Sequence, residues 1–124
     1  MSIEQAPIRP PTYFVLAALK DEPAHGYVLL KSVEELSAGS VRLAAGSLYA
    51  VLDRLSVAGL IETVREETVN GRARRYYALT PQGREVLHAE ATRMAAAAKV
   101  VLDDKPQRRA ARGATARGAA VKPA

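Results

Sequence analysis

Three arginines follow directly on an Asn-Gly pair, at Arg72, Arg74 and Arg75. A guanidinium is always charged near neutral pH, and its planar fork of donors matches the oxygens of a phosphate. The run therefore predicts contacts with the phosphates of a nucleic acid. A solvated hairpin that binds nothing is the alternative for a charge run this short.

A second group of polar side chains lies on one side of a predicted helix over residues 44–58. Ser47 can donate to a phosphate or a base, Tyr49 offers a hydroxyl on an apolar ring, and Arg54 can contact a phosphate one turn further on. The opposite side carries an apolar stripe at helical spacing: Leu48, Val51, Leu52 and Leu55. Tyr49 lies off that stripe, so DNA contact is favoured over burial against a partner subunit. The free amides and the dipole at the helix start also attract phosphate.

Two earlier helices and a hairpin must position these groups. Helices are expected over 13–20, capped by Thr12, and over 25–37, with Ala38-Gly39-Ser40 as the break before the third. Asn70-Gly71 between two β-prone runs, 61–69 and 72–79, predicts a hairpin with a type I′ turn. Tyr27 and Tyr77 are expected in the core.

A last helix is expected from Pro81, with Thr80 as its cap, through about Leu102. Within it, five apolar residues are spaced 4, 3, 4 and 3 apart, which is typical of a helix that packs on a partner helix. They are Leu87, Ala91, Met94, Ala98 and Val101. The alternative is packing on the chain's own domain, but so long a helix would overrun so small a body, which favours a homodimer.

Charge and composition narrow the possible functions. The net charge is +5, but six basic and two acidic residues lie from Asp103 onward, which leaves +1 for the residues through Leu102. The tail, 103–124, is expected to be disordered and basic, since it has too few apolar groups to order itself. No apolar run reaches the roughly 20 residues of a membrane helix, and the first residues lack signal-peptide features, so a cytoplasmic location without membrane contact is expected.

Catalysis and metal binding are not expected. The sequence has no cysteine, no glycine-rich phosphate loop, and no cluster of carboxylates or histidines with catalytic spacing. The two histidines, His25 and His88, fall on different helices, so no metal and no cofactor are assigned. The chain is therefore not expected to be an enzyme.

The order of elements defines a fold class that is mostly α with a two-stranded β wing, a winged helix-turn-helix followed by a C-terminal dimerisation helix. We expect an extended N-terminal arm over 1–11, the DNA-binding domain over 12–80, the dimerisation helix over 81–102 and the tail over 103–124. A helix fits the major groove, and a hairpin beside it reaches the neighbouring backbone or minor groove. Duplex DNA is the expected partner.

Four segments in register resemble the PadR family of transcriptional regulators. They are His25-Gly26-Tyr27, the run from Gly46 through Leu55, Gly59-Leu60-Ile61, and the run from Tyr76 through Gly83. Ala50 stands where the family more often has proline. The single C-terminal helix is similar to the short subfamily.

The resemblance implies a homodimeric, sequence-specific repressor. Its third helices would enter successive major grooves of a palindromic operator while the wings touch the adjacent backbone, and a small-molecule effector or another signal would release it. Short members that hold flat drugs use a tryptophan on the last helix, and this chain has none. Two other functions stay open: a winged helix used only for protein–protein contact, and a sequence-indifferent architectural protein that binds DNA through its basic tail.

Overall fold

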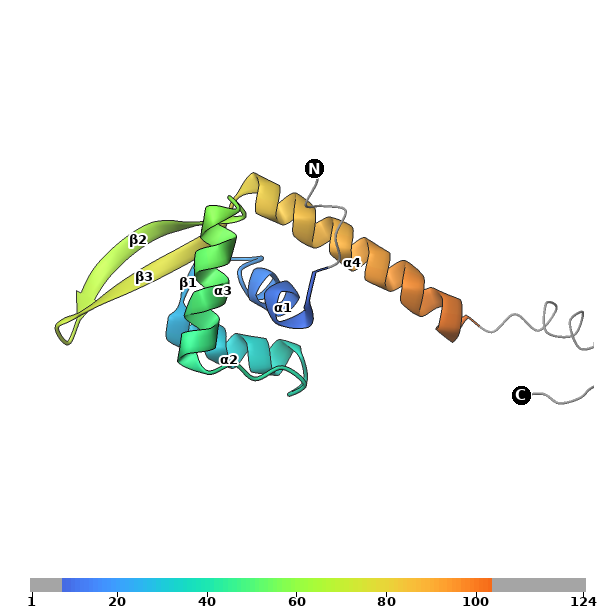
Figure 1. The fold of residues 1–124 in the computed structure, drawn as a ribbon, viewed down its shortest axis with the longest axis horizontal. Coiled ribbons are helices and arrows are strands. Elements are labelled where there is room, and N and C mark those ends of the chain that lie inside the picture. Colours follow the sequence, from blue (N-terminus) through green and yellow to red (C-terminus); the bar gives the residue numbers. More distant parts are fainter. Residues whose placement is uncertain (1–7, 104–124) are drawn as a thin grey trace, which may run out of the picture. The chain divides into compact units, whose positions relative to one another are not determined.

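The structure, a computed structural model, describes residues 8–103, which form two compact units, one up to Thr92 and one from Arg93 onward. Seven elements follow one another along the chain (Figure 1). They are α1 (Pro10–Ala18), β1 (Ala24–His25), α2 (Gly26–Leu36), α3 (Ala45–Val57), β2 (Ile61–Val69), β3 (Arg72–Leu79) and α4 (Pro81–Leu102). The predicted class, mostly helical with a β-hairpin wing, is confirmed.

The first helix begins earlier than the sequence predicts. Thr12 was expected as the cap, yet α1 starts at Pro10 with Arg9 at the N-cap position, and Arg9 makes no side-chain capping bond. Pro10 and Pro11, which were predicted to belong to the arm, lie inside the first turn. Proline is tolerated there because first-turn amides have no partner within the helix. The arm therefore ends before Pro10, and residues 1–7 of it lie outside the described part of the chain, as do residues 104–124 of the predicted tail.

Burial of the apolar faces of α1, α2 and α3 makes one core. The predicted stripe on α3 is buried as expected, with Leu48 and Leu52 fully inaccessible to solvent. The same core takes in side chains of every element of the first unit. Among them are Leu16 of α1, Leu29 of α2, Ala24 of β1, Ile61 of β2, Leu79 of β3 and Val86 of α4. Since the stripe is fixed in the core, the opposite side of α3 must face solvent.

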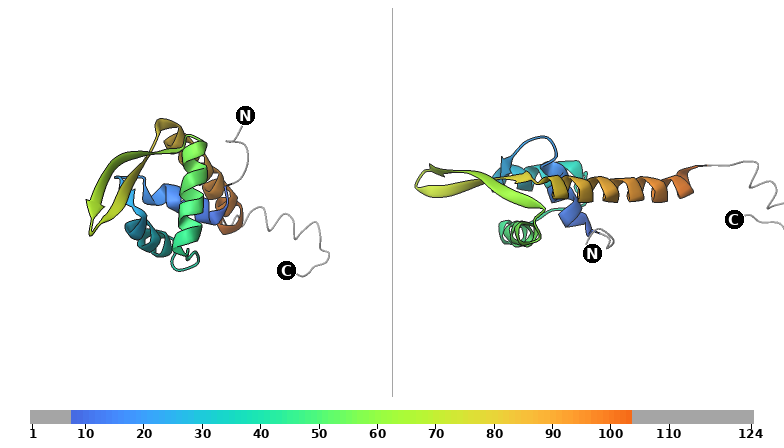
Figure 2. Two further views of the ribbon diagram at one scale, coloured as in Figure 1. Left: turned by 60° about the vertical axis from the view of Figure 1, so that its left-hand side comes forward. Right: turned by 90° about the horizontal axis from the view of Figure 1, so that it is seen from above.

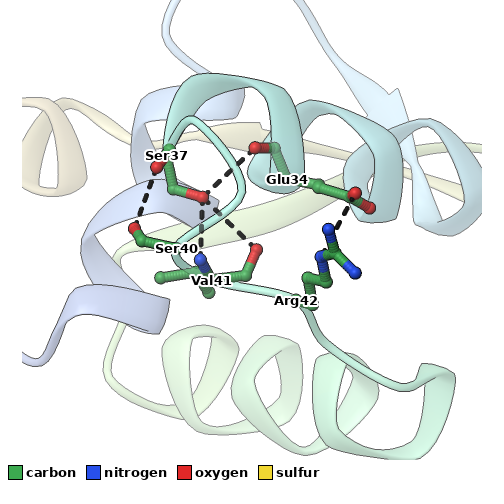
Figure 3. A network of polar contacts seen from close by, with 5 residues as sticks. All are labelled: Glu34, Ser37, Ser40, Val41 and Arg42. Carbon is green, nitrogen blue, oxygen red and sulfur yellow. Dashed lines mark hydrogen bonds and ion pairs between the residues drawn. The ribbon is translucent and has the colours of Figure 1, made fainter.

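The turn between α2 and α3 is closed by a buried serine (Figure 3). The amide of Val41 donates to Ser37 Oγ at 2.9 Å, and Ser40 Oγ donates to the carbonyl of Ser37 at 2.8 Å. Ala38 and Gly39 take positive φ values of 54° and 81°, which reverse the chain after the helix. An ion pair of 3.3 Å between Arg42 and Glu34 lies across the same turn. These contacts fix the direction in which the chain enters α3.

The sheet has three strands in the order β1-β3-β2, all antiparallel. The hairpin turn is as predicted, with Asn70 at φ 52° and Gly71 at φ 77°, the positive values of a type I′ turn. The third strand, β1, was not predicted, because it is only two residues long and forms by pairing with Tyr76 and Tyr77. The hairpin of β2 and β3 extends past α2 and α3 as a wing (Figure 2).

A β-bulge part-way along the wing changes which β2 side chains project from each face of the sheet. Thr63 pairs with Tyr77, but the next pair is Arg65 with Tyr76, so Val64 is an extra residue. Before the bulge, β2 residues with odd numbers share the face of buried Tyr77. After it, they share the opposite face, which carries Tyr76. The bulge therefore decides which side chains of the wing can meet.

A tight junction joins the wing to α4. Gly59, at φ 79°, ends α3 as predicted. Thr80 accepts a hydrogen bond from the amide of Gly83 and donates one to the carbonyl of Gly59, so the predicted cap of α4 is confirmed. The α-carbon of Gly83 lies so near Leu60 that an added Cβ would overlap the Leu60 carbonyl oxygen.

The last helix has the predicted end points, but one of its five predicted dimerisation residues has another place. Leu87 is only 6% exposed and packs in the core of its own domain, because the first turns of α4 cover that core. This corrects its assignment to the partner-facing stripe. Ala91 is half-buried, and within the second unit Met94, Ala98 and Val101 are exposed. No helix within residues 8–103 is both long and apolar enough to cross a membrane.

We expect Gly83→Ala to lower the free energy of unfolding by about 1–3 kcal/mol, because the backbone of Leu60 must shift to admit the methyl group. The matched control is Gly46→Ala in the first turn of α3, where an added Cβ meets nothing within 4 Å. Alanine there should stabilise the fold by about 0.5–1 kcal/mol. Urea unfolding followed by circular dichroism measures both, and equal effects of the two variants would contradict the close approach.

Candidate nucleic-acid interface

A surface hollow of about 550 Å³ lies between the wing, the start of α2 and the first turns of α3. Its lining is dominated by basic and aromatic side chains. The lining residues are His25, Gly26, Tyr27, Tyr49, Val69, Asn70, Arg72, Ala73, Arg74 and Arg75. Four of the six DNA-binding residues predicted from the sequence, one from α3 and three from β3, thus line the same hollow. His25 and Tyr27, which were not predicted as site residues, also line it.

One face of the wing carries the basic side chains in a row. Arg72, Arg74 and Tyr76 alternate along β3 and so project from the same face, and His25 pairs with Tyr76 on that face from β1. The His25 and Tyr76 rings meet edge to face, with centroids 5.2 Å apart. Arg75 alternates with them and projects from the opposite face. The three arginines that are clustered in the sequence are therefore split between two faces of the hairpin.

Glutamates on β2 pair with two of these arginines. Glu67 accepts a 2.7 Å hydrogen bond from the Tyr76 hydroxyl and lies 3.9 Å from an Arg74 nitrogen, and Glu66 accepts a 2.9 Å bond from Arg75 Nε. The Arg65 guanidinium lies over the Tyr76 ring, 3.9 Å from its centroid. All of these contacts follow from the register set by the bulge.

Arg72 differs from its neighbours. Within residues 8–103, no acidic side chain lies within ion-pair distance of it. It pairs across the strands with Val69 beside the turn. Arg72 can therefore meet a phosphate without first giving up a carboxylate.

The other predicted site residues lie at the edge of this arrangement. Ser47 and Arg54 are exposed on α3, as expected, but neither lines the hollow. The expectation that Tyr27 packs in the core is wrong: its side chain is 66% exposed. The expectation for Tyr77 is confirmed, since its side chain is buried in the core.

His25 and Tyr27 were missed as members of the site. Both flank the start of α2, and α2 lies beside the wing only because β1 pairs with β3. No local sequence pattern predicts a strand of only two residues. The one available signal was the position of His25-Gly26-Tyr27 at a helix start.

Burial lowers the pKa of His25 from its ordinary value of 6.5, and the nearby positive charge of Arg74 lowers it further, while Glu67 opposes the shift. The fold thus favours the neutral imidazole. The stability that comes from this preference is fully present above pH 6.5 and declines as the pH falls below 6.5 towards the pKa of the folded state.

Three helices, a paired hairpin and an exposed, partly basic side formed by α3 and the wing define a winged helix-turn-helix protein. The chain belongs to the transcriptional regulator PadR-like family, whose model matches residues 15–89. The resemblance seen in four sequence segments is thereby confirmed. The family is one of transcriptional regulators, which are not enzymes.

Two relatives illustrate the match. The chain is 44% identical over 81 residues to an uncharacterized 37.1 kDa protein in transposon TN4556 of Streptomyces fradiae. The aligned region covers 65% of this chain but only 22% of that protein. The chain is 36% identical over 88 residues to the transcriptional regulator Rv3488 of Mycobacterium tuberculosis, covering 71% of this chain and 78% of the relative.

Solved structures share the fold. A PadR family transcription regulator from Clostridium difficile superimposes with a TM-score of 0.64 at 26% identity, covering 74% of this chain and 94% of that chain. Bacillus subtilis PadR, solved in complex with operator DNA, gives a TM-score of 0.57 at 23% identity, covering 64% of this chain and 46% of that chain.

The two charges around His25 should move its pKa in opposite directions. Arg74→Gln removes a positive charge and should raise the pKa of His25, whereas Glu67→Gln removes a negative charge and should lower it. Titration of the imidazole ring protons by NMR measures both shifts, and His25→Gln identifies the signal. Shifts of the same sign in the two variants would contradict this placement of the charges.

Proposed function

We propose that this chain is a homodimeric, sequence-specific repressor that binds duplex DNA through α3 and the wing. The observation that carries the proposal is the shared hollow: Tyr49 of α3 and Arg72 and Arg74 of the wing line one surface. The fold is the one that Bacillus subtilis PadR has in complex with operator DNA.

In this proposal α3 enters the major groove. Its buried stripe leaves Ser47, Tyr49 and Arg54 on the exposed side, where a hydroxyl can bond a base edge or phosphate and a guanidinium can bond a phosphate. Tyr49 is 47% exposed, so its ring is anchored on one side and open on the other. Base readout is assigned to this helix.

The wing contacts the phosphate backbone. Arg72 binds a phosphate directly, whereas Arg74 must exchange the carboxylate of Glu67 for a phosphate. Exchange of one anion for another yields less net binding energy than contact by an unpaired cation. Arg72 therefore contributes more than Arg74 to affinity, and Arg75, tied to Glu66 on the other face, contributes least.

The dimer is assigned to the exposed apolar stripe of α4, without Leu87. Met94 is 43% and Val101 is 81% exposed, and Ala98 lies between them on the same stripe. Apolar side chains at this spacing are stabilised by burial against a second helix. A symmetric pair of α3 helices would then read a palindromic operator.

Relief of repression by a small molecule or another signal, and a cytoplasmic location, are proposed from family membership. No cofactor is part of the proposal. Two alternative functions are a winged helix used only for protein–protein contact and a sequence-indifferent DNA binder. The experiments below are designed to distinguish the repressor from both.

The experiment that tests the function is a salt titration of binding to the intergenic DNA upstream of the chain's own gene, against a scrambled duplex of equal length. The full chain and a variant truncated after Leu102 are compared. Repressor-type recognition predicts a preference of about a thousandfold or more for both proteins, with a weaker salt dependence for the truncated one. Loss of all binding on truncation would support tail-driven binding, and no binding to any duplex would support a protein–protein module.

Substitutions in the hollow should weaken specific binding while the fold is retained. Tyr49→Ala and Arg72→Gln should each reduce operator affinity roughly tenfold, the scale of one lost base or phosphate contact, and only Arg72→Gln should also reduce the salt dependence. Lys20→Gln is the charge-matched control, because Lys20 is exposed after α1 and lies outside the hollow. Fluorescence anisotropy measures all three, and unchanged affinity of both variants would remove this surface from the reading of DNA.

Met94→Asp should split the dimer, because a carboxylate would be buried in the middle of the apolar stripe. Ala96→Asp is the matched control: it places the same side chain on the exposed opposite side of the same helix. Light scattering across a concentration series measures the mass. A Met94→Asp variant that is still dimeric would exclude this stripe as the interface.

A further inference from the structure

Gly26 occupies the first turn of α2, where the backbone does not require glycine. The positive φ values among the described glycines belong to Gly39, Gly59 and Gly71, and Gly26 is not one of them. Alanine is the better residue within a helix, since glycine adds conformational entropy to the unfolded chain. The reason for glycine at this position must therefore lie outside the helix.

The neighbour of Gly26 is the side chain of Tyr49. An added Cβ would overlap the Tyr49 hydroxyl oxygen and lie 3.0 Å from the ring carbon Cζ and 3.5 Å from Cε1, and these are its three nearest atoms. The tyrosine reaches across from α3 so that its hydroxyl end rests against the first turn of α2. The missing methyl group leaves the space for that end.

The kind of neighbour determines what a methyl group would change. At Gly83 an added Cβ meets the backbone of Leu60, which cannot move without distorting the fold. At Gly26 it meets the tip of a side chain that is 47% exposed and can rotate towards solvent. The fold can therefore accept alanine at position 26, but the Tyr49 ring cannot keep its place.

We propose that Gly26 is a positioning residue for Tyr49: the recess left by its missing side chain holds the phenol end and fixes the ring in the orientation presented to DNA. The proposal rests on the proposed function for the value of that orientation, but not for the contact itself. A ring held at its tip loses little further freedom on binding, which raises affinity by preorganisation. Gly26 thus links the start of α2 to base readout by α3.

A different role for the same glycine makes a different prediction. A glycine can also serve by letting a DNA backbone approach the first amides of a helix closely. In that case an added methyl group would obstruct DNA whatever residue stood at position 49. Coupling between the two positions separates the roles.

The test is a double-mutant cycle with the full chain: wild type, Gly26→Ala, Tyr49→Ala and Gly26→Ala/Tyr49→Ala, each titrated against operator and scrambled DNA. Gly26→Ala alone should weaken operator binding roughly tenfold, as if the tyrosine contact were lost. Adding it to Tyr49→Ala should change affinity by less than about twofold, since no ring remains to be displaced. Equal weakening in both backgrounds would overturn the proposal and support direct obstruction.

Measurements without DNA separate failure of this inference from failure of the proposed function. The Tyr49 ring signals in NMR spectra, identified by their absence in Tyr49→Ala, should shift in free Gly26→Ala. If Tyr49→Ala leaves operator affinity unchanged, the assigned role of Tyr49 in DNA binding is wrong, and the ring shifts still test the positioning. Unshifted ring signals would overturn the inference by themselves.

Thermal unfolding covers the case in which the methyl group harms the fold. Gly26→Ala should unfold at close to the wild-type temperature because the ring can move away. If it unfolds much lower, Tyr49→Phe in the same chain should restore the midpoint, since it removes the atom that overlaps the Cβ. A low midpoint that Tyr49→Phe does not restore would show that position 26 acts on the fold through other contacts and would overturn the proposal.

Discussion

The burial of one apolar stripe on α3 is the constraint on which the candidate interface depends. Leu48, Val51, Leu52 and Leu55 are held in the core, which fixes the rotation of the helix about its axis. Tyr49 is exposed for that reason, and the Ser37 turn fixes where the helix begins. A polar residue in the stripe would therefore destabilise α3 without touching its exposed side, because burying an unpaired polar group costs free energy.

The charged residues of the wing stabilise the hairpin and, in the proposed function, also set its attraction for phosphate. Glu66 and Glu67 of β2 each pair with an arginine of β3, so oppositely charged side chains hold the two strands together. Arg72, beside the turn, has no carboxylate within ion-pair distance among residues 8–103, and Arg65 on β2 contacts the Tyr76 ring instead of a carboxylate. In the proposed function, Arg74 and Arg75 would therefore contribute less to phosphate binding than Arg72, because each already pairs with a glutamate.

In the proposed dimer, helix α4 would have two roles. Its first turns cover the core through Val86 and Leu87, and the junction of Thr80, Gly83 and Leu60 fixes where it starts. Further along, the same 4-and-3 spacing continues with exposed apolar side chains. Periodicity alone cannot divide such a helix into a part that serves its own domain and a part that serves a partner, since both need an apolar stripe.

The sequence by itself determined what depends on neighbours along the chain: the ends of α3 and α4, the Asn70-Gly71 turn, and the side of α3 that faces solvent, because propensity, capping and helical period are local. Local rules also misplaced the start of α1, since Pro10 is acceptable both before a helix and within its first turn. Tertiary structure alone decided the strand β1, the bulge at Val64 and the meeting of Gly26 with Tyr49. Each of these depends on contacts between residues that are distant in sequence, and such contacts form only when the core brings the elements together.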